Sequence, residues 1–206
     1  YTMTKLGGVA DVFVTPSNEK EAVAVIRFAA EKNIPVLMLG NGSNMVVRDG
    51  GVRGIVIHFN QLDQIEVQGT TIYAEAGALL IHVSKAAAKH GLTGFEFACG
   101  IPGSVGGAMA MNAGAYGGEI KDVIFSCKVV TREGEVLTLS KDELELGYRK
   151  SIIAEKNYFV LSSTFELQVG VQEEIDAKIA DLTFQRESKQ PLEYPSAGSV
   201  FKRPPG

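Results

Sequence analysis

The chain has 206 residues, of which 45% are hydrophobic and 21% charged, a composition typical of a globular protein with one large or two small cores. Its formal net charge of −4 argues against general nucleic-acid binding, and no apolar run reaches the roughly 18 residues that a membrane-spanning helix needs. We therefore expect a cytoplasmic protein that binds neither nucleic acid nor a membrane.

The first 60 residues carry a β-α-β pattern. Extended segments are expected at residues 11–15, 36–39, 45–47 and 54–58. After the first of them, Asn18 is placed to cap a helix, with Glu19 in its first turn and apolar residues at helical spacing up to Ala29. This pattern predicts a small sheet and a helix with one buried face.

The pattern changes after residue 60. A hairpin is expected over residues 65–75, a helix over 79–90, and later strands at 128–130, 136–139 and 158–168. This irregular order predicts an α+β domain rather than a repeated β-α-β array. From Gly170 onward, one helical pattern is followed by a proline-rich stretch, which cannot form a core alone. We expect a third domain of which only the beginning is present.

The cysteines and histidines indicate no metal chemistry. Cys99 and Cys127 form no CxxC pair, which argues against a disulfide framework or a zinc site and favours two reduced thiols. The three histidines, His58, His82 and His90, show no ligand spacing and are expected to be surface or core residues. We expect no bound metal.

Residues 40–44, Gly-Asn-Gly-Ser-Asn, form the first glycine-rich motif. They follow a strand, but Met45 stands where a dinucleotide fingerprint has its third glycine, and no helix pattern follows. The motif also lacks the Gly-Lys-Ser/Thr ending of a P-loop. Glycines still allow backbone N–H groups to surround an anion. The residues alone leave a structural turn and a phosphate cradle equally open.

Residues 100–118 form a second and denser motif, with seven glycines in 19 residues. Glycine at this density is entropically costly unless the main chain must approach something closely. The other residues are small and apolar, unlike a flexible linker. The composition favours a flat aromatic ligand lying on the main chain; the alternative is a buried loop packed on a neighbouring helix.

Three short segments contain basic residues that could belong to a site, at residues 148–151, 186–189 and 197–204. The isolated Arg149 reads most simply as a solvated surface cation, whereas the two later segments suit recognition of phosphate or carboxylate. Ser199 follows a glycine, but no histidine is placed nearby in the sequence to activate it, which argues against a hydrolase.

The order of these motifs closely resembles the UDP-N-acetylenolpyruvoylglucosamine reductase (MurB) family, over essentially the whole chain. The motifs that carry the resemblance are Gly-Asn-Gly-Ser-Asn at 40–44, Gly-Ile-Pro-Gly-Ser-Val-Gly-Gly at 100–107, Asn-Ala-Gly-Ala-Tyr-Gly at 112–117, Tyr-Arg at 148–149, and Ala-Gly-Ser-Val-Phe-Lys-Arg-Pro at 197–204. The resemblance implies an α+β FAD-binding fold of the PCMH (vanillyl-alcohol-oxidase-like) type. Its two subdomains would span residues 1–60 and 61–168, and a substrate-binding domain would begin at 169–206.

The resemblance also implies roles for individual residues. Those expected to bind FAD are Gly40, Asn41, Gly42, Ser43, Asn44, Gly100, Ile101, Pro102, Gly103, Ser104, Gly106, Gly107, Asn112, Ala113, Gly114, Ala115 and Arg186. Those expected to bind substrate are Tyr148, Lys189 and Arg203. The implied catalytic residues are Arg149, which would stabilise charge on the conjugated carboxylate, and Ser199, which would donate a proton.

The implied reaction uses NADPH to reduce FAD and then reduces the enolpyruvyl ether of a UDP-sugar, giving UDP-N-acetylmuramate for peptidoglycan synthesis. We expect a monomer with only small-molecule partners. The family's catalytic glutamate would lie beyond residue 206, so we expect a chain truncated at both ends. Two alternatives stay open: another PCMH-type FAD oxidoreductase, for which no His or Cys is arranged to bind flavin covalently, or an FAD- or UDP-sugar-binding module without turnover.

Overall fold

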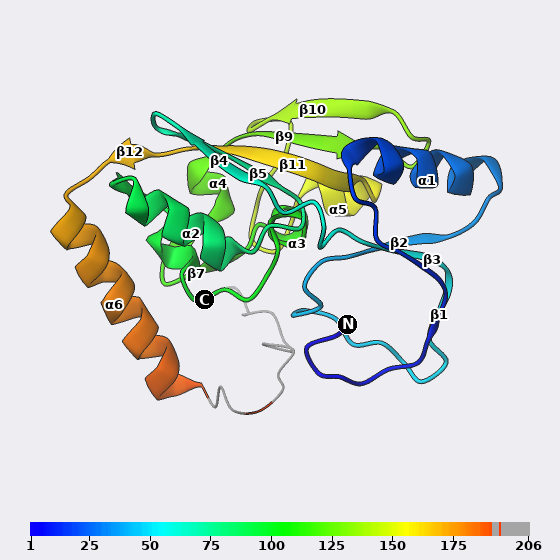
Figure 1. The fold of residues 1–206 in the computed structure, drawn as a ribbon, viewed down its shortest axis with the longest axis horizontal. Helices are drawn as coiled ribbons and strands as arrows, with labels where there is room; N and C mark the ends of the chain where they lie inside the picture. The colour runs from blue at the N-terminus through cyan, green and yellow to red at the C-terminus, as the bar shows by residue number, and fades with distance from the viewer. Residues whose placement is uncertain (191–193, 195–206) are drawn as a thin grey trace.

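A small parallel sheet is built from the N-terminal part of the chain (Figure 1). The structure is a computed structural model that describes residues 1–190 and 194. The sheet order is β1-β3-β2, formed by β1 (Ala10–Val14), β2 (Val36–Leu39) and β3 (Val52–His58). The extended segment expected at residues 45–47 is wrong, because these residues belong to no strand. Among the described residues no strand pairs with this apolar run, and the Val46 side chain is exposed.

Helix α1 (Glu19–Glu31) connects β1 to β2. Its start follows from the sequence, because the Asn18 side chain accepts a hydrogen bond from the N–H of Glu21 at 3.0 Å. Ala22, Ile26 and Ala29 lie on its buried face. The predicted helix is therefore present, with one face packed on the core.

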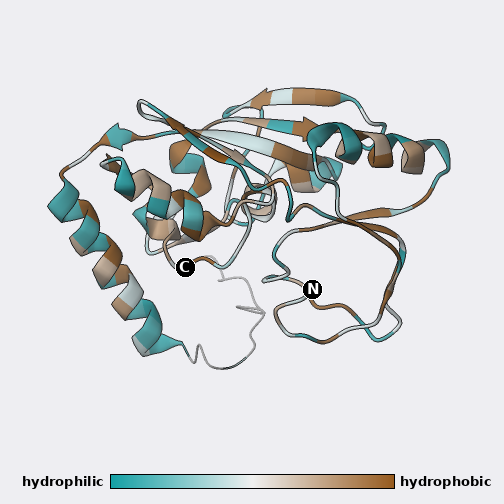
Figure 2. Ribbon diagram, in the orientation of Figure 1, coloured by the Kyte–Doolittle hydropathy of each residue, from teal (hydrophilic) through white to brown (hydrophobic). Residues whose placement is uncertain are grey.

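A five-stranded antiparallel sheet forms the larger part of the molecule, in the order β10-β9-β11-β5-β4. Its strands are β4 (Ile65–Gln68), β5 (Thr71–Glu75), β9 (Ile124–Val130), β10 (Val136–Ser140) and β11 (Phe159–Glu166). The central β11 is mostly buried, and the hydrophobic residues of these strands are visible in Figure 2. The sheet confirms the expected hairpin and the three later strands.

The helices and short ladders around this sheet carry the glycine-rich segment. They are α2 (Leu80–Lys89), the 3-10 helix η1 (Glu96–Ala98), α3 (Val105–Met111), α4 (Ile120–Val123) and α5 (Ile152–Lys156), with β6 (Leu92–Thr93), β7 (Gly114–Ala115), β8 (Gly118–Glu119) and β12 (Gln168–Val169). Sequence reasoning did not foresee α3. Val105, Ala108 and Met109 are buried on one side of it, and the helix packs against β5, β11 and α5, so tertiary contacts offset its glycines.

Helix α6 (Gln172–Lys189) follows β12 and stands at one end of the molecule (Figure 1). Its two ends are hydrophilic and its apolar residues lie in the middle (Figure 2). Only Ile175 and Leu182 are buried in this 18-residue helix, which packs on η1 and α2. Helix α6 is therefore attached through few apolar contacts.

One hydrophobic core joins the two sheets, α1 and the helices on the larger sheet. Phe95 is fully buried in it and packs edge-to-face against Phe165, with 4.9 Å between ring centroids. Burial raises the pKa of the Cys127 thiol to about 12, so this group stays protonated. Among the described residues, no helix has both the length and the apolar character needed to cross a membrane.

Candidate functional site

The two glycine-rich motifs meet in space although they are far apart in the sequence. The side-chain amide of Asn41 donates a hydrogen bond to the carbonyl of Pro102 at 2.7 Å. A Cβ on Gly40 would collide with Ser104 Oγ, so a side chain there would displace the serine hydroxyl. The two main-chain segments therefore form one surface.

Ser104 lies at the centre of this surface. It occupies the N-cap of α3, yet its side chain makes no capping hydrogen bond. Ser104 Oγ is buried and has no hydrogen-bond partner among the described residues. A buried hydroxyl without a partner is costly, and this one lies beside Gly40 and Gly107. We define the surface formed by residues 40–44 and 100–107 as the glycine cradle.

A short run of main chain holds the cradle in place. The N–H of Leu80 donates to the carbonyl of Gly103 at 3.0 Å, and the N–H of Val105 donates to Ala78 at 2.8 Å. The N–H of Gly106 donates to the carbonyl of Ala76 at 2.8 Å. Because the N–H of Gly106 is already bonded to Ala76, it cannot donate to a ligand in the cradle. The absence of a side chain at Gly106 instead permits a close approach to its main chain.

The other end of the first motif is covered by the N-terminal residues. The N–H of Met3 donates to the carbonyl of Gly42 at 3.1 Å. Gly42 has a φ of +63°, and a Cβ there would collide with the carbonyl of Tyr1. Ser43, the next residue, lies near Gly103 of the second motif.

Asn112 ends α3 in the left-handed conformation, with a φ of 45°. Its side chain is almost fully buried and bonded entirely to protein. After it, Ala113 is buried, while Gly114 and Ala115 form β7 and pair with β8. The side-chain amide of Asn112 is thus not free to contact a cofactor, although the family resemblance implies that Asn112 is one of the FAD-binding residues.

Arg149 lies at the tip of a tight turn between Gly147 and Lys150. These two residues exchange hydrogen bonds, each N–H donating to the other's carbonyl at 3.1 Å. Arg149 has a φ of 55°, which is uncommon for a residue with a side chain and is often found at functional sites. Its guanidinium lies 5.4 Å from the ring centroid of Tyr148.

Arg186 is the one basic residue of α6 that the structure brings to the glycine motifs. A Cβ on Gly100 would lie 2.6 Å from Arg186 Cδ, so the arginine side chain passes directly over this glycine. Lys189 is exposed one turn further and donates to Gln185 at 3.4 Å. Ser199 and Arg203, two further sequence-predicted site residues, lie outside the described residues.

Glu96 is a buried charged residue that sequence reasoning missed. Its carboxylate accepts hydrogen bonds from Thr93 Oγ1 at 2.6 Å and from the N–H of Gly94 at 3.0 Å, and it pairs with Lys178 of α6 at 3.3 Å. Burial alone would raise the pKa of Glu96, but these hydrogen bonds and the charge of Lys178 outweigh burial and lower it. This ion pair attaches α6, and with it Arg186, to the segment that precedes Gly100.

Replacing Lys178 by methionine should therefore loosen α6. We expect the docking of α6 to weaken by about 1 kcal/mol, since the lysine is half-exposed and Glu96 keeps its other hydrogen bonds. The measurement is amide hydrogen exchange in the full-length protein, where α6 should exchange roughly fivefold faster. Lys150→Met, which breaks an ion pair with Glu155 elsewhere, is the matched control. Equal exchange of α6 in both variants would contradict the prediction.

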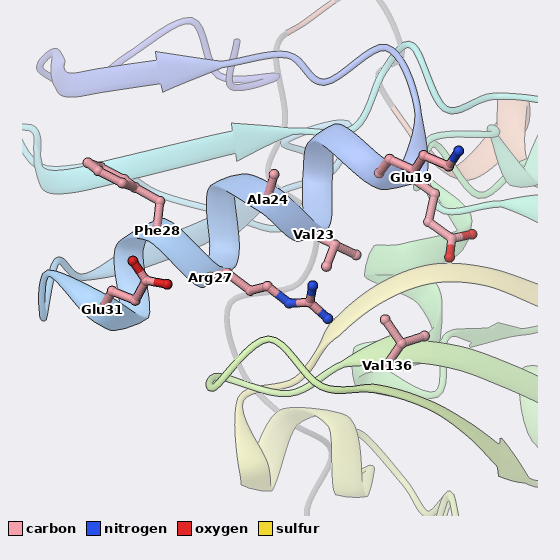
Figure 3. A pocket seen from close by; sticks show the side chains of 8 residues that line it. Glu19, Val23, Ala24, Arg27, Phe28, Glu31 and Val136 are labelled. Carbon is pink, nitrogen blue, oxygen red and sulfur yellow. The ribbon is translucent and has the colours of Figure 1, made fainter.

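A separate groove lies between α1 and β10 (Figure 3), with a volume of about 540 Å³. Its lining residues are Glu19, Lys20, Val23, Ala24, Arg27, Phe28, Glu31 and Val136. Arg27 reaches across to the β9–β10 turn and donates to the carbonyl of Gly134 at 3.0 Å. The groove contains no sequence-predicted site residue and lies where α1 packs beside β10. In the described part of the chain, no group of three or more His, Cys, Asp or Glu side chains is placed to hold a metal.

Known proteins match most or all of this chain. A family described as FAD binding domain matches residues 10–140. The UDP-N-acetylenolpyruvoylglucosamine reductase 2 of Bacillus cereus is 59% identical over 205 residues, covering 100% of this chain and 67% of that protein. The UDP-N-acetylenolpyruvoylglucosamine reductase of Exiguobacterium sibiricum is 54% identical over 206 residues, covering 100% of this chain and 68% of the relative.

Solved structures give the same picture of the fold. The crystal structure of UDP-N-acetylenolpyruvylglucosamine reductase from Thermus caldophilus superimposes with a TM-score of 0.84 at 32% identity, covering 99% of this chain and 72% of that chain. An alkyldihydroxyacetonephosphate synthase matches with a TM-score of 0.59 at 18% identity, over 76% of this chain and 34% of that one, which shows a shared fold alone. These matches confirm the expected α+β FAD-binding fold of the PCMH type.

Proposed function

Because this chain belongs to the UDP-N-acetylenolpyruvoylglucosamine reductase family, we propose that it is the FAD-binding part of an NADPH-dependent enzyme that reduces the enolpyruvyl ether of UDP-N-acetylglucosamine-enolpyruvate to UDP-N-acetylmuramate. The reaction supplies a precursor of peptidoglycan. We also propose that residues 1–60 and 61–168 form its two FAD-binding subdomains, and that residues 169–206 begin the substrate-binding domain. The enzyme works as a cytoplasmic monomer.

The glycine cradle is the observation that carries the proposal. It presents main chain from two motifs, made accessible by the absence of a side chain at Gly40, together with a buried hydroxyl on Ser104 that has no hydrogen-bond partner in the described part of the chain. A dinucleotide that carries many acceptor atoms on a flexible pyrophosphate fits such a surface. In this proposal the cradle holds the pyrophosphate, and the main chain of residues 112–115 and the Arg186 side chain line the rest of the cofactor.

Once bound, FAD supplies the hydride-transfer chemistry, and the protein orients the reactants. Arg149 then stabilises the negative charge that develops on the carboxylate of the enolpyruvyl group, a contribution commonly worth about 3 kcal/mol for one well-aimed donor. Ser199 donates the proton that completes the lactyl ether. Tyr148, Lys189 and Arg203 bind the substrate. The turn that presents Arg149 supports this assignment, because it fixes the arginine in an unusual backbone conformation.

A spectroscopic titration of the purified full-length protein tests the function. We expect a visible flavin spectrum that is bleached by NADPH without oxygen and restored by the enolpyruvyl UDP-sugar; NADH, run in parallel, measures the coenzyme preference. Bleaching without any response to the sugar would indicate a different FAD oxidoreductase. Flavin binding without bleaching by either coenzyme would instead indicate a binding module without turnover.

A further inference from the structure

The buried side chain of Asn112 connects three segments of the site. Its Nδ2 donates to Glu119 Oε2 at 2.6 Å and to the carbonyl of Gly147 at 3.0 Å. Its Oδ1 accepts from the N–H of Lys121 at 2.9 Å. The partners fix the orientation of the amide, because the two acceptors require the nitrogen and the N–H requires the oxygen.

The bond to Gly147 reaches the turn that presents Arg149. Gly147 and Lys150 close this turn with their pair of hydrogen bonds, so a fixed Gly147 carbonyl fixes the base of the turn. On the other side of the turn, the hydroxyl of the fully buried Ser151 donates to the carbonyl of Ala110 at 2.6 Å. Both flanks of the turn are thus attached to the C-terminal end of α3.

Helix α3 extends this connection to the glycine cradle. Ser104 lies at its N-cap and Asn112 at its C-cap, so eight residue steps along the helix axis separate the two residues, about 12 Å. The helix is buried against β5 and β11, so its two ends are fixed relative to each other. One rigid element therefore places the arginine turn at a set distance from the cradle.

We propose that Asn112 is a positioning residue for Arg149: its side-chain amide fixes the Gly147–Lys150 turn on α3 and so sets where the guanidinium meets the substrate. The inference rests on the proposed role of Arg149, and it gives Asn112 a function other than contact with the cofactor. Glu119 supports it, since its second oxygen pairs with Lys121 at 2.6 Å and holds the carboxylate against the Asn112 amide.

The test compares Asn112→Gly with Asn157→Gly in the full-length holoenzyme. Both asparagines end a helix in the left-handed conformation, which glycine adopts without strain, but Asn157 is exposed at the end of α5. Asn112→Gly removes the three hydrogen bonds and keeps the backbone conformation. A second variant, Asn112→Asp, keeps the side-chain size and the acceptor for Lys121 but replaces both donors by an oxygen that faces the Glu119 carboxylate and the Gly147 carbonyl, so it should release the turn by repulsion as well.

Amide exchange of residues 145–152 is the first readout, and it does not depend on the reaction. We expect this turn to exchange at least about tenfold faster in the Asn112 variants and at the parental rate in Asn157→Gly. The second readout separates the half-reactions: reoxidation of the flavin by substrate should fall about 10- to 100-fold, as a displaced catalytic group would cause, while reduction by NADPH and the flavin spectrum stay unchanged.

Two outcomes would overturn the inference. Unchanged exchange of the turn in the Asn112 variants would show that Asn112 does not hold it. Equal losses in both half-reactions, accompanied by weaker FAD binding, would assign Asn112 to general stability or to the cofactor. If the parental enzyme itself ignored the UDP-sugar, the proposed function would fail, yet the exchange measurement would still report whether Asn112 fixes the turn.

Discussion

Arg149→Ala in the full-length enzyme is expected to slow reoxidation of the flavin by the enolpyruvyl UDP-sugar about 10²- to 10³-fold. The expectation follows from the loss of one charged donor aimed at a developing negative charge. Reduction of the flavin by NADPH should stay near the parental rate, because the charge on the substrate develops only in the second half-reaction. Stopped-flow absorbance, following each half-reaction separately, is the measurement.

Two further substitutions serve as comparisons for Arg149→Ala. Arg149→Lys keeps the charge but loses the planar fork of donors, so we expect only partial recovery. Lys150→Ala changes the neighbouring residue, whose exposed ion pair with Glu155 contributes little, and should leave both half-reactions unchanged. An unaltered rate of reoxidation in Arg149→Ala would remove this arginine from the chemistry.

Gly77→Ala is expected to cause a large loss of stability. A Cβ on Gly77 would collide with the carbonyl oxygen of Phe59 and lie 2.8 Å from that of Leu62. Both obstacles are main chain, so no side-chain rotation relieves them. The N–H of Gly77 also donates to Leu62 at 2.8 Å, which ties the residue to this position. We expect a loss of about 3 kcal/mol, or about 6 °C or more in Tm, measured by thermal unfolding.

The same change should weaken FAD binding, because Gly77 lies between Ala76 and Ala78, whose carbonyls hold the cradle at Gly106 and Val105. Gly50→Ala is the matched control: no atom lies within 4 Å of a Cβ built there, and we expect a change within about 0.5 kcal/mol. Similar Tm values for the two variants would show that the backbone near Gly77 yields more easily than its contacts indicate.

Local patterns predicted most of the elements. Asn18 and the spacing of Ala22, Ile26 and Ala29 indicated α1, and the hairpin of β4 and β5 was readable from its turn. Two elements were misread for opposite reasons. The apolar residues at 45–47 find no partner strand, whereas the glycines around Val105 are held in a helix by packing on β5 and β11. In both cases tertiary contacts overrode local preference.

The sequence by itself determined the family and the fold class. The reason is that the glycine motifs reflect which residue types the main chain tolerates, and their order along the chain can be read directly from the sequence. Only the tertiary structure decided which of those residues meet: Ser104 with Gly40, Arg186 with Gly100, and Asn112 with Gly147 rather than with a free surface. Such contacts join segments far apart in the chain, so the spacing of residues within one segment cannot predict them. Their free energy depends on distances that exist only after both sheets and the helices have packed.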